Sequence, residues 1–268
     1  MGRGWIKAKE ISFNCFLLFE RFQIRGMFGS WKSEDKKWLQ NMSVALKYNP
    51  AVKWYLQYKC PECSKFIEEV AAKSIGEVPP EEVRKAEIFV IDGVEDFVTY
   101  TKPEIMDSNC DFIYAWDKSR LFELVDFKDK TVLDVGSGSG RLAFAAAEFA
   151  KEVYASEPVD TLREYLRDKI ASENIKNMRV VDGMAHSLPY PDNTFDIVMS
   201  GHVVGDDYDN EIAELSRVCK SGGWLLDCPG EIMGGPPDEE AVNRGWEEFV
   251  YTGKFGTDVY RYRKQVVK

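Results

Sequence analysis

The chain has 268 residues, which is enough for one large domain or for a domain of about 150 residues with a smaller companion. Hydrophobic residues make up 44% and aromatic residues 13%, a composition that supports a packed core and excludes a disordered chain. The formal net charge of −10 disfavours a protein that mainly binds a nucleic-acid backbone, because phosphate contacts need clustered lysine and arginine.

The charge is unevenly distributed along the chain. Residues 1–50 carry nine Lys and Arg and four Asp and Glu, a net charge of +5, so the remaining residues carry −15. A basic segment of this kind either contacts an anionic partner or forms a solvated helix face, and the second interpretation is the common one. Residues 1–26 could also be an extension upstream of a start at Met27.

Six cysteines are spread over the chain: Cys15, Cys60, Cys63, Cys110, Cys219 and Cys228. This spacing is not that of a secreted disulfide scaffold, and it predicts reduced thiols in a cytoplasmic protein. The compact pair in 60-CPEC-63 is half of a zinc site by its spacing. The sequence holds no second such pair, so we prefer a plain helix start and predict no metal.

No apolar run reaches the ~20 residues that a membrane-spanning helix needs. The segment 11-ISFNCFLLF-19 is short, is interrupted by Asn14, and is followed by Glu20 and Arg21. It lacks a small-residue cleavage site. We therefore expect a core-facing element rather than a signal peptide, and no membrane partner.

Residues 1–128 are predicted to form a helical region that covers the substrate side of the following domain. Ser33 is a candidate N-cap for a helix over 34–48, which Asn49 and Pro50 would end. Further helices are predicted over 62–75, from Pro79 to 98, and over 112–126.

Residues 129–268 are predicted to form a second domain, in which short apolar runs alternate with helical patterns. The apolar runs begin at Thr131, Glu152, Met178, Phe195 and Gly223, and the helices between them lie near 140–150, 160–173 and 209–220. This alternation predicts an α/β, Rossmann-like and mainly parallel sheet with helices on both faces. Residues 247–267 resemble two strands joined at Gly253–Gly256, which would add an antiparallel strand at the C-terminus.

The stretch 131-TVLDVGSGSGR-141 ends the first predicted strand in a glycine-rich turn. In an open parallel sheet, ligands bind beyond the C-terminal ends of the strands, and glycines let the backbone approach them. A dinucleotide site would need glycine where Arg141 stands, and a P-loop would need a lysine that the turn lacks. Asp134 lies two residues before Gly136, inside the strand. A buried carboxylate there needs a partner, which a cofactor with an ammonium group would supply and a pyrophosphate would not.

The segment 132-VLDVGSGSG-140 resembles the first motif of the class I S-adenosylmethionine-dependent methyltransferases. Glu157, after the second predicted strand, matches the acidic residue that holds the ribose hydroxyls in that family. The segments 183-GMAHSLPYPDNTFDIVMS-200 and 214-ELSRVCKSGGWLLDC-228 are similar to those that follow in the family. The resemblance covers roughly residues 115–268 and is strongest to the methyltransferase type 11, ubiquinone-biosynthesis-like branch.

The resemblance implies S-adenosylmethionine as the cofactor and methyl transfer to a small-molecule acceptor. The cofactor-binding residues that it implies are Asp134, Gly136, Ser137, Gly138, Gly140, Glu157, Pro158, Met184, Ala185 and Gly201. In that branch the position of Met184 is commonly Asp, which hydrogen-bonds the adenine amino group. Here the backbone near Met184 and Ala185, together with apolar packing, would hold the adenine.

A hydroxyl acceptor needs a general base, whereas a sulfur or a neutral amine needs little acid–base help. His202 follows the fourth predicted strand on the ligand edge and is the candidate catalytic base, with a packing role as the alternative. Tyr114 and Trp116 are candidates to line the acceptor pocket, and Asp206 is a candidate to orient a cationic acceptor. The alternatives are core positions for the two aromatics and a helix cap for Asp206.

Two other classes of function stay open. One is a non-catalytic S-adenosylmethionine-binding scaffold or sensor, and the other is a methyltransferase of RNA or protein, of which the overall acidity disfavours RNA. A nicotinamide enzyme is disfavoured by Arg141. The helices that would set acceptor specificity carry no recognisable motif.

Overall fold

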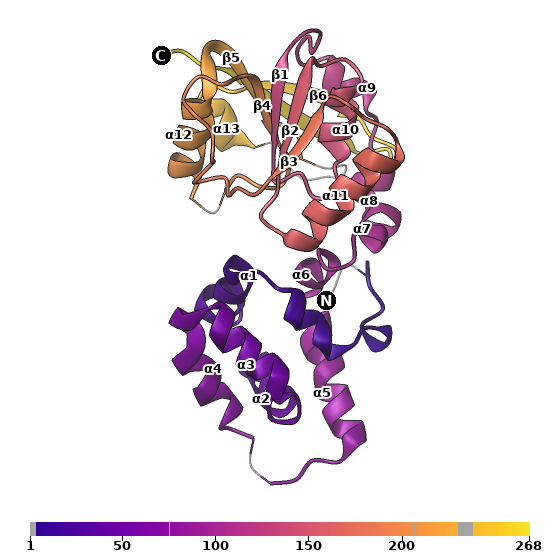
Figure 1. The fold of residues 1–268 in the computed structure, drawn as a ribbon, viewed down its shortest axis with the longest axis vertical. Coiled ribbons are helices and arrows are strands. Elements are labelled where there is room, and N and C mark those ends of the chain that lie inside the picture. The colour runs from indigo at the N-terminus through magenta and orange to yellow at the C-terminus, as the bar shows by residue number, and fades with distance from the viewer. Residues whose placement is uncertain (1–3, 75, 206, 230–237) are drawn as a thin grey trace. The chain divides into compact units, whose positions relative to one another are not determined.

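The computed structural model describes residues 4–74, 76–205, 207–229 and 238–268. The chain forms two compact units, Met1–Met106 and Asp107–Lys268, which are coloured from indigo to yellow in Figure 1. Residues 107–128, predicted to belong to the helical region, are part of the second unit. No helix among the described residues is long and apolar enough to cross a membrane.

The first unit is helical. Its helices are α1 (Arg21–Gly26), α2 (Lys36–Tyr48), α3 (Pro50–Lys59), α4 (Ser64–Ala71), α5 (Pro80–Asp92) and α6 (Glu95–Thr99), and α7 (Pro103–Asn109) follows. Its core is rich in aromatic side chains, and Phe16, Phe19 and Trp38 are fully buried. The segment 11–19 therefore faces the core, as expected from its composition.

Several helix predictions for this unit were wrong at their ends. Asp35, not Ser33, caps α2, since its Oδ1 accepts a hydrogen bond from Trp38 N at 3.0 Å. Asn49 and Pro50 end α2 as predicted, and Pro50 also begins α3, because a proline at the first helical position loses no hydrogen bond. The long helix expected from Pro79 to 98 breaks at Gly93, where an added Cβ would lie 2.6 Å from the indole of Trp38.

The helix predicted over 112–126 is replaced by two short ones, α8 (Asp111–Tyr114) and α9 (Ser119–Phe122). The Asp117 side chain explains the interruption. Its Oδ1 accepts hydrogen bonds from Ser119 N at 3.0 Å and from Ser119 Oγ at 2.7 Å, which starts a new turn.

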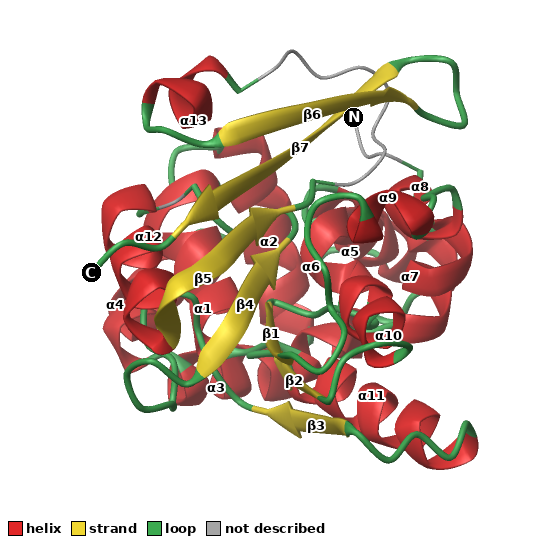
Figure 2. Ribbon diagram, turned by 90° about the horizontal axis from the view of Figure 1, so that it is seen from above, coloured by secondary structure: helices red, strands yellow, loops and turns green. Residues whose placement is uncertain are grey.

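The second unit is built on one seven-stranded sheet. Its strands are β1 (Thr131–Val135), β2 (Glu152–Ser156), β3 (Met178–Val181), β4 (Phe195–Ser200), β5 (Cys219–Asp227), β6 (Glu247–Thr252) and β7 (Asp258–Gln265), in the order β3-β2-β1-β4-β5-β7-β6. The first five strands are parallel and β7 is antiparallel to both of its neighbours. Figure 2 shows β6 and β7 as a long ribbon beside β5. The predicted fold class is confirmed.

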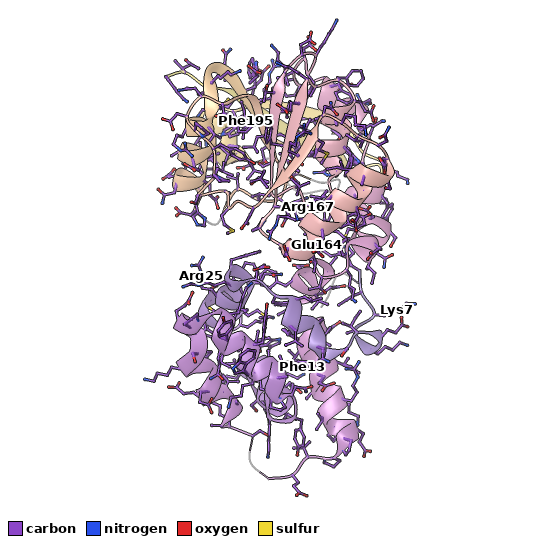
Figure 3. All side chains as sticks on the ribbon, in the orientation of Figure 1. Lys7, Phe13, Arg25, Glu164, Arg167 and Phe195 are labelled. Atoms are coloured by element: carbon purple, nitrogen blue, oxygen red, sulfur yellow. The ribbon has the colours of Figure 1, made fainter. Side chains whose placement is uncertain are left out.

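Helices cover both faces of this sheet. The short alanine-rich α10 (Arg141–Ala147) and α11 (Asp160–Ser172) pack on one face, and α12 (Tyr208–Val218) and α13 (Glu239–Asn243) pack on the other. The strands carry apolar side chains to both sides, as buried parallel strands do. Phe195, at the start of β4, is completely buried among them (Figure 3).

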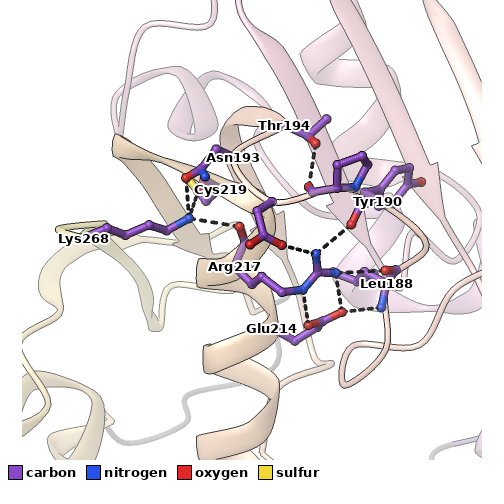
Figure 4. A network of polar contacts seen from close by, with 10 residues as sticks. Leu188, Tyr190, Asn193, Thr194, Glu214, Arg217, Cys219 and Lys268 are labelled. Carbon is purple, nitrogen blue, oxygen red and sulfur yellow. Dashed lines mark hydrogen bonds and ion pairs between the residues drawn. The ribbon is translucent and has the colours of Figure 1, made fainter.

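A polar network fixes the segment that leads into β4 (Figure 4). The Arg217 guanidinium, near the end of α12, donates to Glu214 at 2.7 Å, to Asp192 at 2.8 Å and to the carbonyl oxygen of Leu188 at 3.1 Å. Lys268 Nζ donates to Asn193 Oδ1 at 2.7 Å. These bonds tie the loop after β3 to α12 and to the last residue of the chain.

The order of the strands places the ligand-binding edge. Strand β1 pairs with β2 on one side and with β4 on the other, so the chain reverses its direction of progress at β1. In sheets of this kind, the crevice at such a reversal, beyond the carboxyl ends of the strands, is where ligands bind. The loops after β1 and β4 meet there.

Candidate functional site

The glycine turn after β1 has a left-handed backbone conformation that residues other than glycine rarely adopt. Gly136, Gly138 and Gly140 have φ angles of +65°, +56° and +96°. A side chain in this left-handed region is strained. A Cβ at Gly136 would also lie 2.4 Å from Val203 Cγ2, so the turn packs directly against the segment after β4.

Asp134 is buried below this turn, with 1% of its surface exposed. Its Oδ2 accepts a hydrogen bond from Ala143 N at 3.0 Å. Burial raises the pKa of Asp134 from 3.8 to about 7, and the nearby guanidinium of Arg141 opposes this shift. The carboxylate would therefore gain from a second positive charge.

Glu157 is the second buried carboxylate, with 4% of its surface exposed. Its Oε2 accepts from Gly138 N at 2.8 Å and its Oε1 accepts from Val159 N at 2.9 Å. Burial raises its pKa from 4.5 to about 7 in spite of these bonds. Each carboxylate oxygen has a further lone pair for a ligand hydroxyl. Pro158 follows and is half-buried.

The two serines of the turn differ in their bonding. Ser137 Oγ donates to the carbonyl oxygen of Asp134 at 2.9 Å and so holds the turn together. Ser139 Oγ is buried and has no hydrogen-bond partner within the described part of the chain. Because buried hydroxyls normally have partners, Ser139 marks a position that a polar ligand atom would satisfy.

The loop after β3 forms a tight turn. Met184 N donates to Ser187 O at 3.3 Å, and Ser187 N donates to Met184 O at 2.8 Å, so both backbone groups of Met184 are engaged. Ala185 is buried, and a Cβ at Gly183 would lie 2.4 Å from Ser156 Oγ. The turn is thus held close to the end of β2, beside Glu157.

His202 lies two residues after β4, at the expected edge of the sheet. It has a φ of +63°, which is uncommon for histidine, and its side chain is exposed. Its ring lies edge-on to Phe112, with the ring centroids 5.2 Å apart. Backbone strain of this kind concentrates at functional sites.

The three residues assigned to the acceptor side lie in different surroundings. Tyr114 is 49% exposed, with Lys254 Nζ 5.5 Å from its ring centroid. Trp116 is half-buried beneath the Arg141 guanidinium, 5.0 Å from its ring. Asp206 lies outside the described residues.

Arg141 lies at the candidate site, and its contacts there were not predicted from the sequence. Its Nη2 donates to Cys228 O at 2.6 Å, and its Nη1 is buried without a hydrogen-bond partner among the described residues. A Cβ at Gly201 would lie 2.6 Å from Nη2, so Gly201 makes room for this arginine. The sequence signal that could have indicated these contacts is the positive charge of Arg141 at the start of a predicted helix, where the helix dipole disfavours a cation.

The cysteine pair of the first unit lies at a helix boundary. Cys60 follows α3, Cys63 precedes α4, and both are buried as free thiols. Among the residues that the structure describes, no group of three or more His, Cys, Asp or Glu side chains could hold a metal ion.

A family model described as a methyltransferase domain matches residues 133–227. The match runs from β1 to the last residue of β5 and includes the glycine turn, Asp134 and Glu157. Residues 133–227 are a methyltransferase domain. The cofactor that the resemblance of the glycine turn implies is S-adenosylmethionine.

Curated relatives of this methyltransferase domain include the uncharacterised methyltransferase YcgJ of Bacillus subtilis, 30% identical over 97 residues, which are 35% of this chain and 38% of that protein. The demethylmenaquinone methyltransferase of Geobacillus kaustophilus is 34% identical over 104 residues, 37% of this chain and 44% of that protein. The chain thus spans less than half the length of these two relatives. The crystal structure of an S-adenosylmethionine-dependent methyltransferase from Aquifex aeolicus superposes with a TM-score of 0.51 at 22% identity, over 63% of this chain and 98% of that one. This likeness shows the fold.

The donor set of the methyltransferase domain fits this cofactor. Asp134 and Glu157 are buried carboxylates with raised pKa values, which means that their charges are incompletely balanced within the protein. Ser139 adds a buried hydroxyl without a partner among the described residues. A ligand with an ammonium group and hydroxyl groups has the matching chemistry.

Proposed function

We propose that the protein is an S-adenosylmethionine-dependent methyltransferase that methylates a small molecule. The observation that carries the proposal is the pair of buried carboxylates, Asp134 and Glu157, on either side of one glycine turn at the sheet's reversal point. The demethylmenaquinone methyltransferases among its relatives are named for a small-molecule acceptor, which supports the same class here. The scattered spacing of the six cysteines, which is not that of a secreted disulfide scaffold, supports a cytoplasmic location.

On the cofactor side, the Asp134 carboxylate would bind the ammonium group and Glu157 would bind the ribose hydroxyls. Gly136, Gly138 and Gly140 would let the backbone approach the ligand, with the hydroxyls of Ser137 and Ser139 on the same turn. Pro158, Met184 and Ala185 would hold the adenine. The bound cofactor supplies a methyl group on a sulfonium, which is already activated for transfer. The residues of the site therefore need to align the acceptor and exclude water.

On the acceptor side, His202 takes the proton of an acceptor hydroxyl. Its position beyond β4 supports this role, as does the strained backbone at φ +63°. Tyr114 and Trp116 supply apolar contact area for the acceptor, and Arg141 holds Trp116 in place.

Formation of S-adenosylhomocysteine from S-adenosylmethionine, measured with a panel of hydroxyl, amine and thiol acceptors, tests the function. We expect turnover with at least one hydroxyl acceptor, and a fall in kcat of about 10²–10⁴-fold in His202→Asn. Asparagine is the right replacement because it tolerates the left-handed backbone at this position. Cofactor affinity should not change in this variant.

Two results would count against these assignments. Turnover that is unchanged in His202→Asn would remove the general base. Cofactor binding without turnover on any acceptor would favour a non-catalytic scaffold.

A further inference from the structure

A pocket of about 170 Å³ lies on the face of the sheet that α12 and α13 cover. Three aromatic and three acidic residues account for most of its lining: Tyr208, Trp246, Tyr262, Asp227, Asp238 and Glu240. The remaining lining residues are apolar side chains and a glycine, and none of the ten is a lysine or an arginine. Such a wall favours a ligand that is both cationic and partly apolar.

Hydrogen bonds that involve the Trp246 indole N–H and the hydroxyls of Tyr208 and Tyr262 hold the three aromatic rings in place. Trp246 Nε1 donates to Tyr208 OH at 2.7 Å, and Tyr262 OH accepts from Asp238 N at 2.7 Å. One face of the Tyr208 ring already carries a cation, the Arg244 guanidinium, at 4.3 Å from the ring centroid. Because the rings are fixed in this way, the aromatic wall is preorganised, and a ligand would not have to order these side chains on binding.

Two of the acidic side chains are engaged in local structure. Asp238 Oδ1 accepts from Ala241 N at 2.9 Å and caps α13. Glu240 is paired with Arg244, one turn further along, at 2.7 Å. These bonds account for both groups without a ligand.

Asp227, the last residue of β5, is the exception. Its hydrogen bond from Ser200 Oγ is long, at 3.4 Å, and is the one that it forms within the described part of the chain. Burial raises its pKa to about 6, while the positive charges of Arg261 and Arg141 lower it. Those two guanidinium groups donate to other acceptors: Arg261 to Tyr251 OH at 2.8 Å and Arg141 to Cys228 O at 2.6 Å. Apart from the long bond from Ser200, the Asp227 carboxylate therefore accepts no side-chain hydrogen bond within the described part of the chain.

The register of the sheet relates this pocket to the cofactor turn. Val135, Ser200, Asp227 and Tyr262 are consecutive partners across β1, β4, β5 and β7. Since neighbouring strands lie about 4.8 Å apart, Asp227 lies about 10 Å from the residue that precedes Gly136. A small molecule can span that distance, with one end in the pocket and the other at the ligand edge of β1.

We propose that this pocket recognises an alkylammonium group of the methyl acceptor, with Asp227 as the counter-charge and Tyr208, Trp246 and Tyr262 as the aromatic wall. The proposal rests on the proposed function, and it assigns the substrate class: a small cationic amine that is methylated at another atom, about 10 Å from its charge. The ammonium group is a binding handle, so no proton or methyl group moves in the pocket.

Calorimetry on the full chain with saturating S-adenosylhomocysteine tests this with two probes of equal shape, choline and its uncharged carbon analogue 3,3-dimethylbutan-1-ol. We expect choline to bind at least about tenfold more tightly than the analogue, since a cation gains from both the carboxylate and the rings. Asp227→Asn should remove most of that preference and leave the affinity of the analogue unchanged. Asp168→Asn is the matched control, because Asp168 is exposed and lies on α11, on the other face of the sheet.

Equal binding of the two probes, or binding of neither, would overturn the proposal, as would an Asp227→Asn variant that keeps the preference for choline. A titration of the same sample with S-adenosylhomocysteine distinguishes failure of the pocket assignment from failure of the proposed function. Cofactor binding without choline binding refutes the pocket assignment alone, whereas absence of cofactor binding refutes the proposed function. Unchanged cofactor affinity in Asp227→Asn shows that the variant is folded.

Discussion

At the scale of single residues, the carboxylates of Asp134 and Glu157 are expected to make the stability of the fold depend on pH. Burial raises both pKa values to about 7, from 3.8 and 4.5. A carboxylic acid with a raised pKa favours the folded state in its protonated form. Its contribution to stability is therefore complete below about pH 4 and is lost as the pH rises to about 7. A bound cation reverses this penalty, because it stabilises the charged form of the carboxylate.

Cofactor affinity should consequently depend on pH. On the proposed assignment, Asp134 and Glu157 bind S-adenosylhomocysteine in their charged form, so its affinity should weaken as the pH falls from 8 to 5, by up to about tenfold per pH unit for each linked group. Calorimetry at pH 7 in two buffers of different ionisation enthalpy should show proton release on binding. An affinity that is constant over this range would contradict the assignment of these residues.

At the scale of elements, the join between β1 and α10 is the most constrained part of the domain. Gly140 has a φ of +96° and is the N-cap of α10, and a Cβ there would lie 2.4 Å from Phe144 Cε2 and 2.7 Å from Leu166 Cδ2. A side chain at this position therefore meets both backbone strain and two neighbours that are packed on the sheet.

Gly140→Ala should lower the free energy of unfolding by about 2–4 kcal/mol, of which about 1–2 kcal/mol is the left-handed backbone and the remainder is steric. Gly222→Ala is the matched control, since Gly222 has a φ of +80° and a Cβ there would have no atom within 4 Å. Urea unfolding should show a loss of about 1–2 kcal/mol for the control. Equal losses of unfolding free energy in the two variants would mean that the side chains of Phe144 and Leu166 move to accommodate the added methyl group, which would contradict the steric part of this prediction.

The sheet and the cofactor turn could be predicted because their signals are local. A change of hydrophobic period marked the strands, and 132-VLDVGSGSG-140 marked the turn. The helix break at Gly93 could not be predicted, because the hydrophobic period describes residues 79–98 as one helix. The break depends on Trp38, which lies 55 positions earlier in the sequence. Asp227 and Arg141 were missed for the same reason: their importance comes from neighbours on other strands.

At the scale of the whole molecule, the sheet order brings distant segments to one edge. The turn after β1, Glu157 after β2, the 183–187 turn after β3 and His202 after β4 are spread over about 65 residues, and they follow four adjacent parallel strands. The net charge of −10 does not argue for an anionic polymer as the acceptor. A small molecule that binds at this edge agrees with both facts.

The central claim is that this edge holds S-adenosylmethionine through Asp134. The measurement that tests it most directly is calorimetric titration of the full chain with S-adenosylmethionine and S-adenosylhomocysteine at pH 8, with NAD as the negative control. Asp134→Asn is compared with Asp168→Asn, an exposed aspartate on α11. We predict binding in the micromolar range, no binding of NAD, and a loss of affinity of at least about tenfold in Asp134→Asn but not in Asp168→Asn. Absence of binding to the wild-type chain, or full affinity in Asp134→Asn, would contradict the claim.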